Sequence, residues 1–139
     1  MSTTTWPDVE GALRAWLRER PEIQAVVDRR VFFGVPDGAR FPLITVSRVG
    51  GGEDFSPDVP LDLATIELQV WGNPRRKGET TAIVNALRGV LHDVRGRVPL
   101  NADVDAFGAA VAGVAYSPDP ATDQPRYIVT AQVTAMSAA

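Results

Sequence analysis

The sequence predicts an α+β fold, a mostly antiparallel β-sheet of about four to five strands with two main helices packed on one face. Two segments, residues 9–17 and 83–94, repeat apolar residues at helical spacing, and runs rich in β-branched residues lie on both sides of the second. The order helix, strands, helix, strands, with short connections, favours an α+β domain over a parallel doubly wound one. A chain of 139 residues fits one domain, residues 1–139, and it contains no internal repeat.

The first helix is predicted from four apolar residues at i, i+4, i+7 and i+8, which share one face: Val9, Leu13, Trp16 and Leu17. Pro7 suits the first turn, where a missing N–H costs nothing, and Asp8 suits the positive end of the helix dipole. Pro21 is expected to open a short second helix that ends at Val27. The segment "RRVFFGVP" then predicts a brief strand that runs into a turn.

Two stronger strands are predicted next. "FPLITVSRV" is rich in β-branched residues. "DLATIELQVW" alternates apolar and polar residues, so Ala64, Ile66 and Leu68 share one face while Glu67 and Gln69 share the other. This alternation is typical of an antiparallel strand with only one covered face.

The second long helix is predicted from an apolar stripe formed by Ile83, Leu87, Val90, Leu91 and Val94. Asn73 is a candidate start, although Gly78 weakens the first turn, and Gly96 is placed to end the helix. Two closing strands, in residues 104–119 and 125–136, are joined by a proline-rich turn.

Three consecutive glycines stand between the two stronger strands and are followed by an acidic stretch. The segment lacks the GxxxxGK[ST] and GxGxxG phosphate patterns, and no helix follows it, so it does not predict a nucleotide site. We expect an extended loop at about residues 50–62, which is either a loose hairpin tip or an arm for subunit contacts. The candidate interface or lumen residues are Gly50, Gly51, Gly52, Glu53, Asp54, Phe55 and Asp58.

Charge is distributed unevenly along the chain. Residues 53–62 contain only acidic charges, whereas residues 75–97 carry six basic residues against two acidic ones. Arg75, Arg76 and Lys77 form the candidate basic patch complementary to the acidic loop. Either both are solvated faces or they are surfaces that meet between copies of the chain. The net charge of −3 argues against a dedicated nucleic-acid-binding protein.

The sequence contains no arrangement typical of catalysis, of a cofactor or of a metal. His92 is the single histidine, it has no GxSxG partner, and a position near a helix C-terminus suits it electrostatically. The chain has no cysteine, and its acidic pairs lack the spacing of a calcium loop. We therefore expect no enzyme activity, no cofactor and no bound metal. No apolar run approaches the roughly 20 residues of a membrane span, so no membrane contact is expected.

The layout of the chain resembles the tail terminator (tail completion or minor tail) proteins of long-tailed, siphovirus-type bacteriophages, especially those that infect actinobacteria. Four segments carry the resemblance: "WPDVEGALRAWLRERPEIQAVVDRRVFFGVP", "FPLITVSRVGGG", "DLATIELQVWG" and "GETTAIVNALRGVLHDV". They cover most of residues 6–95, and the two closing strands fit more loosely.

The resemblance implies a structural virion protein that assembles in the host cytoplasm and resides in the virion, at the neck end of the tail. Copies of such proteins form a ring, implied to be a hexamer, that caps the tail tube, stops its polymerisation and joins it to a neck or head-completion protein. Genomic DNA passes through the ring as a non-specific cargo. A head–tail connector (neck) ring subunit is the alternative, and a small enzyme is a more distant one.

A closed ring needs two different contact patches on each subunit, and the acidic loop and the basic region are candidates. Trp71 and Ile128 fall on the polar faces of their predicted strands. Two interpretations stay open for this pair: a neighbouring subunit covers them, or a loop of the same chain does.

Overall fold

The fold is a six-stranded sheet with helices on one side. The computed structural model describes residues 5–54 and 59–138. The elements in chain order are α1 (Val9–Arg18), α2 (Pro21–Val27), β1 (Val31–Phe32), β2 (Leu43–Glu53), β3 (Asp62–Trp71), α3 (Lys77–His92), β4 (Arg95–Pro99), β5 (Val104–Tyr116) and β6 (Arg126–Ser137). The strands lie in the order β1-β2-β3-β6-β5-β4, and every neighbouring pair except parallel β1–β2 is antiparallel.

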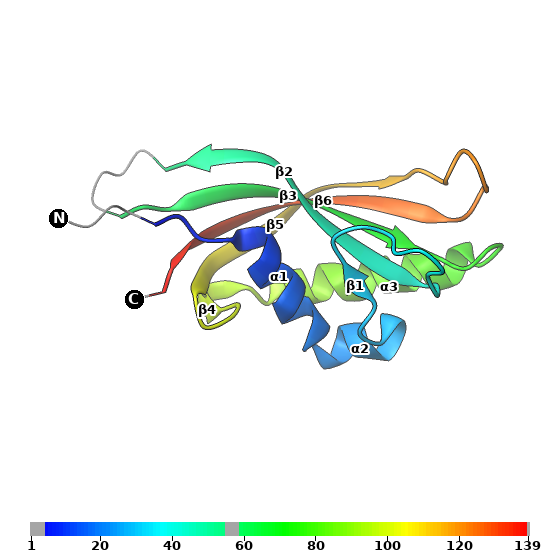
Figure 1. The fold of residues 1–139 in the computed structure, drawn as a ribbon, viewed down its shortest axis with the longest axis horizontal. Coiled ribbons are helices and arrows are strands. Elements are labelled where there is room, and N and C mark those ends of the chain that lie inside the picture. Colours follow the sequence, from blue (N-terminus) through cyan, green and yellow to red (C-terminus); the bar gives the residue numbers. More distant parts are fainter. Residues whose placement is uncertain (1–4, 55–58, 139) are drawn as a thin grey trace.

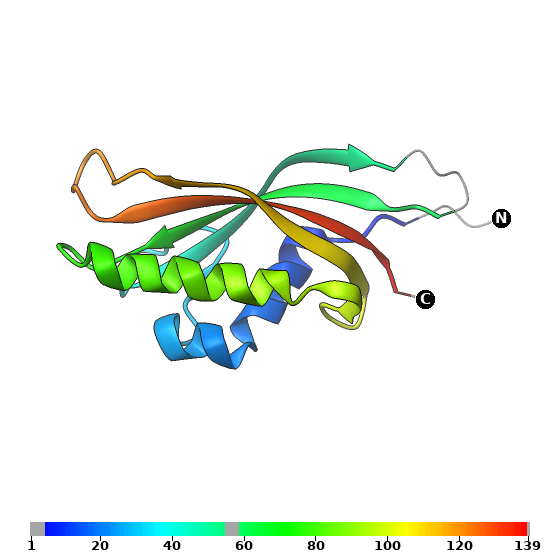
Figure 2. The ribbon, with the colours of Figure 1, turned by 180° about the vertical axis from the view of Figure 1, so that it is seen from behind.

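The core lies between the sheet and the helical layer. Figure 1 shows α1 and α3 beneath one face of the sheet, with α2 below them, and Figure 2 shows the same layers from behind. In β3 every second side chain from Ala64 to Val70 is buried, and the paired positions of β6 are buried too, except half-buried Tyr127. Leu13 and Leu17 of α1 and Leu87 and Leu91 of α3 complete this cluster from the helical side. The predicted antiparallel strand with one covered face is therefore confirmed.

The α+β class and the helical layer agree with the sequence-based expectation, but the sheet has six strands instead of four to five. The additional strand is β4, whose residues are mostly exposed and show no apolar alternation. Gly96 adopts a positive φ of 64° where the β4–β5 register shifts, so it bends a strand and does not end the helix. The helix α3 already ends at His92, because the N–H of Asp93 turns back onto the carbonyl of Val90.

An ion pair between neighbouring strands compensates for the poor strand character of β4. Arg97 donates from Nε to Oδ2 of Asp105 in β5 at 2.8 Å, and its Nη2 lies 2.7 Å from the same oxygen. Asp105 is buried, so this charge-assisted contact holds an otherwise exposed strand on the sheet. Such a pair joins residues through space, and strand patterning in the sequence does not reveal it.

The sheet is longer than the helices that cover it. β5 has 13 residues and α3 has 16, which correspond to lengths of about 43 Å and about 24 Å. The β2–β3 hairpin therefore extends past the helical layer at one end of the molecule, whereas the β5–β6 hairpin at the opposite end lies over the start of α3 (Figures 1 and 2). The β2–β3 hairpin has no described helix beneath it and is available for other contacts.

The core defines a first prediction. Leu68 in the middle of β3 is fully buried, so Leu68→Ala removes buried apolar surface and leaves a cavity. We expect the free energy of unfolding, measured by urea denaturation, to fall by about 2–5 kcal/mol. Gln132→Ala, on the uncovered face of the neighbouring β6, is the control and should change stability by less than about 0.5 kcal/mol. Equal effects of the two substitutions would contradict the one-sided core.

Candidate interaction surfaces

The three glycines lie in a strand rather than in a loop. β2 continues through Glu53, and Gly50, Gly51 and Gly52 pair in register with residues of β3 after a bulge at Val49. The part of the predicted 50–62 loop that precedes Asp54 is thus regular hairpin, because β3 supplies backbone partners along one side. We call residues 49–54 and 59–63 the β2–β3 arm.

Gly51 explains why glycine is required in the arm. Its φ of 111° is rarely adopted by residues with a side chain, and a Cβ at this position would overlap the carbonyl oxygen of Leu63. Gly52, by contrast, has open space around it and an ordinary backbone. Glycine is therefore required at one position, Gly51, where the two strands approach closely just beyond the bulge. The entropy cost of ordering glycine is explained at that position.

An ion pair fixes the base of the arm. Arg48 binds Asp62 through two parallel hydrogen bonds, Nη1 to Oδ2 at 2.6 Å and Nη2 to Oδ1 at 2.7 Å. Hydrogen bonding to this carboxylate raises the pKa of Arg48, against the opposing effect of burial. The backbone N–H of Arg48 also donates to Oε2 of Glu10 in α1 at 2.7 Å. One arginine thus connects both strands of the arm to the first helix.

The acidic residues of the predicted loop do not form one exposed group. Asp62 is buried in its pair with Arg48, whereas Glu53 and Asp54 are exposed on the arm. The N–H of Asp54 donates to the carbonyl of Leu61 at 3.0 Å, which extends the hairpin by one step. Phe55 and Asp58, which were also named as interface or lumen candidates, lie outside the described residues.

The candidate basic patch lies at the other end of the molecule, where α3 begins (Figure 1). Arg75 is exposed and has a φ of 64°. Nη1 of Arg76 lies 3.6 Å from Oε2 of Glu79, which forms an ion pair at the start of the helix. Nζ of Lys77 lies 4.0 Å from the centre of the Tyr116 ring. The patch and the acidic arm therefore do not meet within one chain. Contacts between copies remain a prediction.

Two residues of the same chain cover part of Trp71. Phe41 lies against it at a ring separation of 6.5 Å, and the guanidinium of Arg126 lies 4.9 Å from the centre of its ring. Trp71 and Ile128 are both half-buried, so covering by a neighbouring subunit stays open for both.

An uncharged strand edge is a surface that the sequence reasoning missed. β4 pairs with β5 only as far as Gly108, so the outer edge of β5 has no strand partner in the described residues beyond that point. All five residues from 112 to 116 are exposed. The signal in the sequence is the run "AFGAAVAGVAY", eleven residues without a charge or a proline.

The described residues include no cluster of three or more metal-ligating side chains. His92 occupies the last turn of α3 and is exposed, which fits the helix-terminus interpretation. Within residues 5–54 and 59–138, no helix has both the length and the apolar character needed to cross a membrane.

Comparisons with known proteins point to a family. The model of the family described as tail completion protein gp17 matches residues 11–136 of the chain. Among solved structures, a chain in the virion of a native gene transfer agent particle superimposes with a TM-score of 0.73. This similarity covers 94% of the present chain and 95% of the other at 13% sequence identity, and it shows a shared fold. A search of proteins with curated functions gave no match.

The glycine geometry yields a second prediction. Gly51→Ala introduces a Cβ that overlaps the β3 backbone at a φ that alanine disfavours, and we expect a loss of about 1–3 kcal/mol in unfolding free energy. Gly52→Ala is the matched control and should cost far less, because nothing lies within 4 Å of its added Cβ. Equal stabilities in urea titrations would contradict the assignment of the constraint to Gly51.

The ion pair yields a third prediction. Asp62→Asn keeps the side-chain shape but leaves one buried acceptor for two guanidinium donors, so unfolding free energy should fall by about 1.5–3 kcal/mol. Amide hydrogens of residues 49–53 should also exchange faster, because the base of the arm loosens. Glu53→Gln, an exposed change on the same arm, should leave both measurements close to those of the unmodified protein. Unchanged exchange in Asp62→Asn would show that the pair does not fix the arm.

Proposed function

Because the chain belongs to the tail completion protein gp17 family, we propose that it is a tail terminator whose copies form a ring capping the tube of a long phage tail. The family match, which extends over residues 11–136, is the observation that carries the proposal. It agrees with the resemblance drawn from the order of helices and strands. In this role the protein is a structural part of the virion, and it acts by binding to other proteins rather than by catalysing a reaction.

The proposed ring has six copies. One of its surfaces binds the last layer of tail tube protein and stops further polymerisation, and the opposite surface receives a neck or head-completion protein. Genomic DNA passes through the central opening without sequence-specific contacts, which suits a chain with a net charge of −3. Assembly takes place in the host cytoplasm, and the mature ring sits at the neck end of the tail.

The shape of the subunit supports ring formation. A ring closes through heterologous contacts, which require two different patches on each copy. The subunit has two distinct ends: the β2–β3 arm with exposed Glu53 at one, and Arg75, Arg76 and Lys77 at the other (Figures 1 and 2). Opposite charge at opposite ends favours head-to-tail contacts and disfavours contacts between like ends.

Electron microscopy tests this function directly. The purified protein, alone and mixed with assembled tail tubes, should appear as closed rings and should occupy one end of each tube. Tube length should stop increasing once the protein is added, because the growing end is covered. A monomeric protein that leaves tube growth unchanged would overturn the proposal, and rings that bind capsids but never tubes would indicate a neck connector instead.

A further inference from the structure

The sheet has two open edge segments that match each other. On β2, only Ile44 and Thr45 pair with β1, and the backbone N–H of Arg48 donates a hydrogen bond to the side chain of Glu10. Beyond the bulge, Gly50–Glu53 pair regularly with β3 on one side, while the other side has no strand partner among the described residues. On β5, Gly113–Tyr116 likewise follow a bulge, pair regularly with β6 and have no described strand on the outer side.

Backbone geometry identifies the groups that point outward. The N–H of Asp54 donates to Leu61 across the hairpin, so by strand alternation Glu53 and Gly51 direct their N–H and C=O groups away from β3. The N–H of Ser117 donates to Arg126 of β6 at 2.8 Å, so Tyr116 and Val114 direct theirs away from β6. Each open segment thus offers two residues whose outward backbone donors and acceptors have no strand partner in the described part of the chain.

The β5 segment lacks the usual protection of an edge strand. Soluble proteins place lysines or prolines on exposed edges because a bare edge pairs with other strands. Residues 106–116 contain neither, and Val114 and Tyr116 are 38% and 40% exposed. An apolar, uncharged edge of this kind is consistent with a strand that is covered in the assembled protein.

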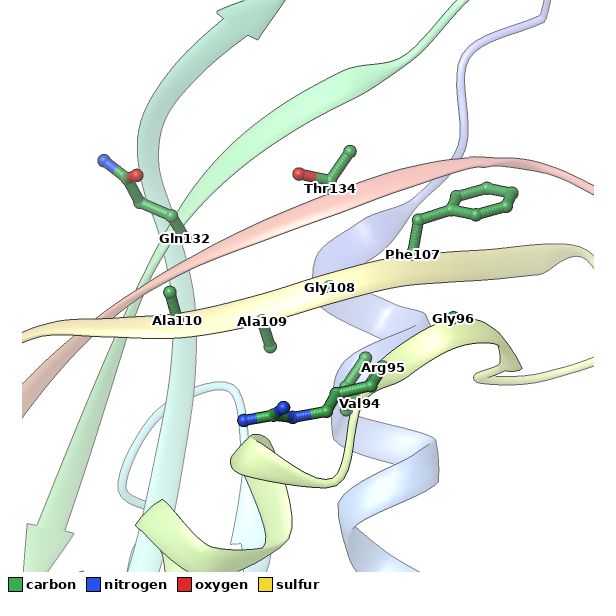
Figure 3. Close-up of a pocket in the computed structure, with 9 residues that line it drawn as sticks. All are labelled: Val94, Arg95, Gly96, Phe107, Gly108, Ala109, Ala110, Gln132 and Thr134. Carbon is green, nitrogen blue, oxygen red and sulfur yellow. The ribbon is translucent and has the colours of Figure 1, made fainter.

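Charge favours the β2 segment as the partner of the β5 segment. A groove of about 360 Å³ runs beside the start of the open β5 edge, and Arg88, His92 and Arg95 line it together with Ala109 to Val111. Figure 3 shows the neighbouring cavity, in which the Arg95 side chain extends alongside Ala109. Lys77 lies over Tyr116 at the far end. The β2 segment instead ends in exposed Glu53.

Strand direction also permits the match. Three antiparallel steps, β2–β3, β3–β6 and β6–β5, separate the two edges, so β2 and β5 run in opposite directions. When copies are related by rotation in a ring, β5 of one copy therefore meets β2 of the next in antiparallel orientation. The open segments lie at opposite ends of the sheet (Figure 1), so neighbours must be staggered, as in barrels with tilted strands.

We propose that residues Gly50–Glu53 of one copy pair with residues Gly113–Tyr116 of the next, which joins the sheets of neighbouring subunits into one continuous sheet around the ring. This inference rests on the proposed ring and specifies its contact. Glycines on the β2 segment leave space for Val114 and Tyr116 of the neighbour, since an aromatic side chain covers an edge glycine well. The arm with its glycines is then a docking strand for a second copy.

Two proline variants test the pairing. Val114→Pro and Glu53→Pro each remove one outward N–H, and proline is tolerated where the N–H faces solvent on an edge strand. Each variant should remain folded by circular dichroism and thermal melting, yet native mass spectrometry should show complete loss of the ring. Val114→Thr keeps the N–H, and Glu53→Asp keeps both the N–H and the negative charge, so both should assemble like the unmodified chain.

Mixing the two proline variants tests which edges meet. Val114→Pro retains an intact β2 edge and Glu53→Pro an intact β5 edge, so an equimolar mixture should form one-to-one heterodimers that cannot grow. Rings formed by either folded variant, or a mixture that stays monomeric, would overturn the pairing. If the unmodified chain itself forms no ring, the proposed function fails first; if it forms rings and the proline variants do too, only the edge pairing fails.

Discussion

The packing of one sheet face against α1 and α3 is the constraint on which the rest of the molecule depends. Buried apolar residues alternate along β3 and β6, and they form one cluster with residues of α1 and α3. Burial of that face provides the main stabilisation and leaves the other face and the sheet ends to interact with solvent or with other molecules. Because the β2–β3 hairpin extends past the helices, it is stabilised by a local ion pair as well as by its strand pairing.

Two surface segments, the β2–β3 arm and β4, each have their own device. At the β2–β3 arm, the guanidinium of Arg48 contacts Asp62 and Gly50, and its backbone N–H donates to Glu10, so one residue connects both strands to the first helix. At the other side of the sheet, Arg97 holds β4 through the buried Asp105. In both cases a partly exposed arginine neutralises a buried aspartate. Removal of either partner therefore affects a surface segment more than the core.

A packed core with open strand edges beyond it suits a protein that assembles with other proteins. The core specifies one shape, and the strand edges beyond it present backbone groups whose geometry is already formed, which lowers the entropy cost of pairing. The membership of the tail completion family agrees with a role in contacts between proteins. Flexible glycine alone does not create the arm; Gly51 permits a close strand approach, and the ion pair holds it.

The sequence by itself determined the α+β class, α1 and α3, the short α2 and the strong strands, because periodic apolar residues encode which side of each element is buried. It also pointed to the acidic arm and the basic patch. It did not reveal β4, the continuation of β2 through the glycines or the covering of Trp71 by Phe41 and Arg126. Those features depend on partners distant in the chain: a backbone pair, a buried carboxylate or a stacked ring. Local pattern carries no information about such partners, so only the tertiary structure decided them.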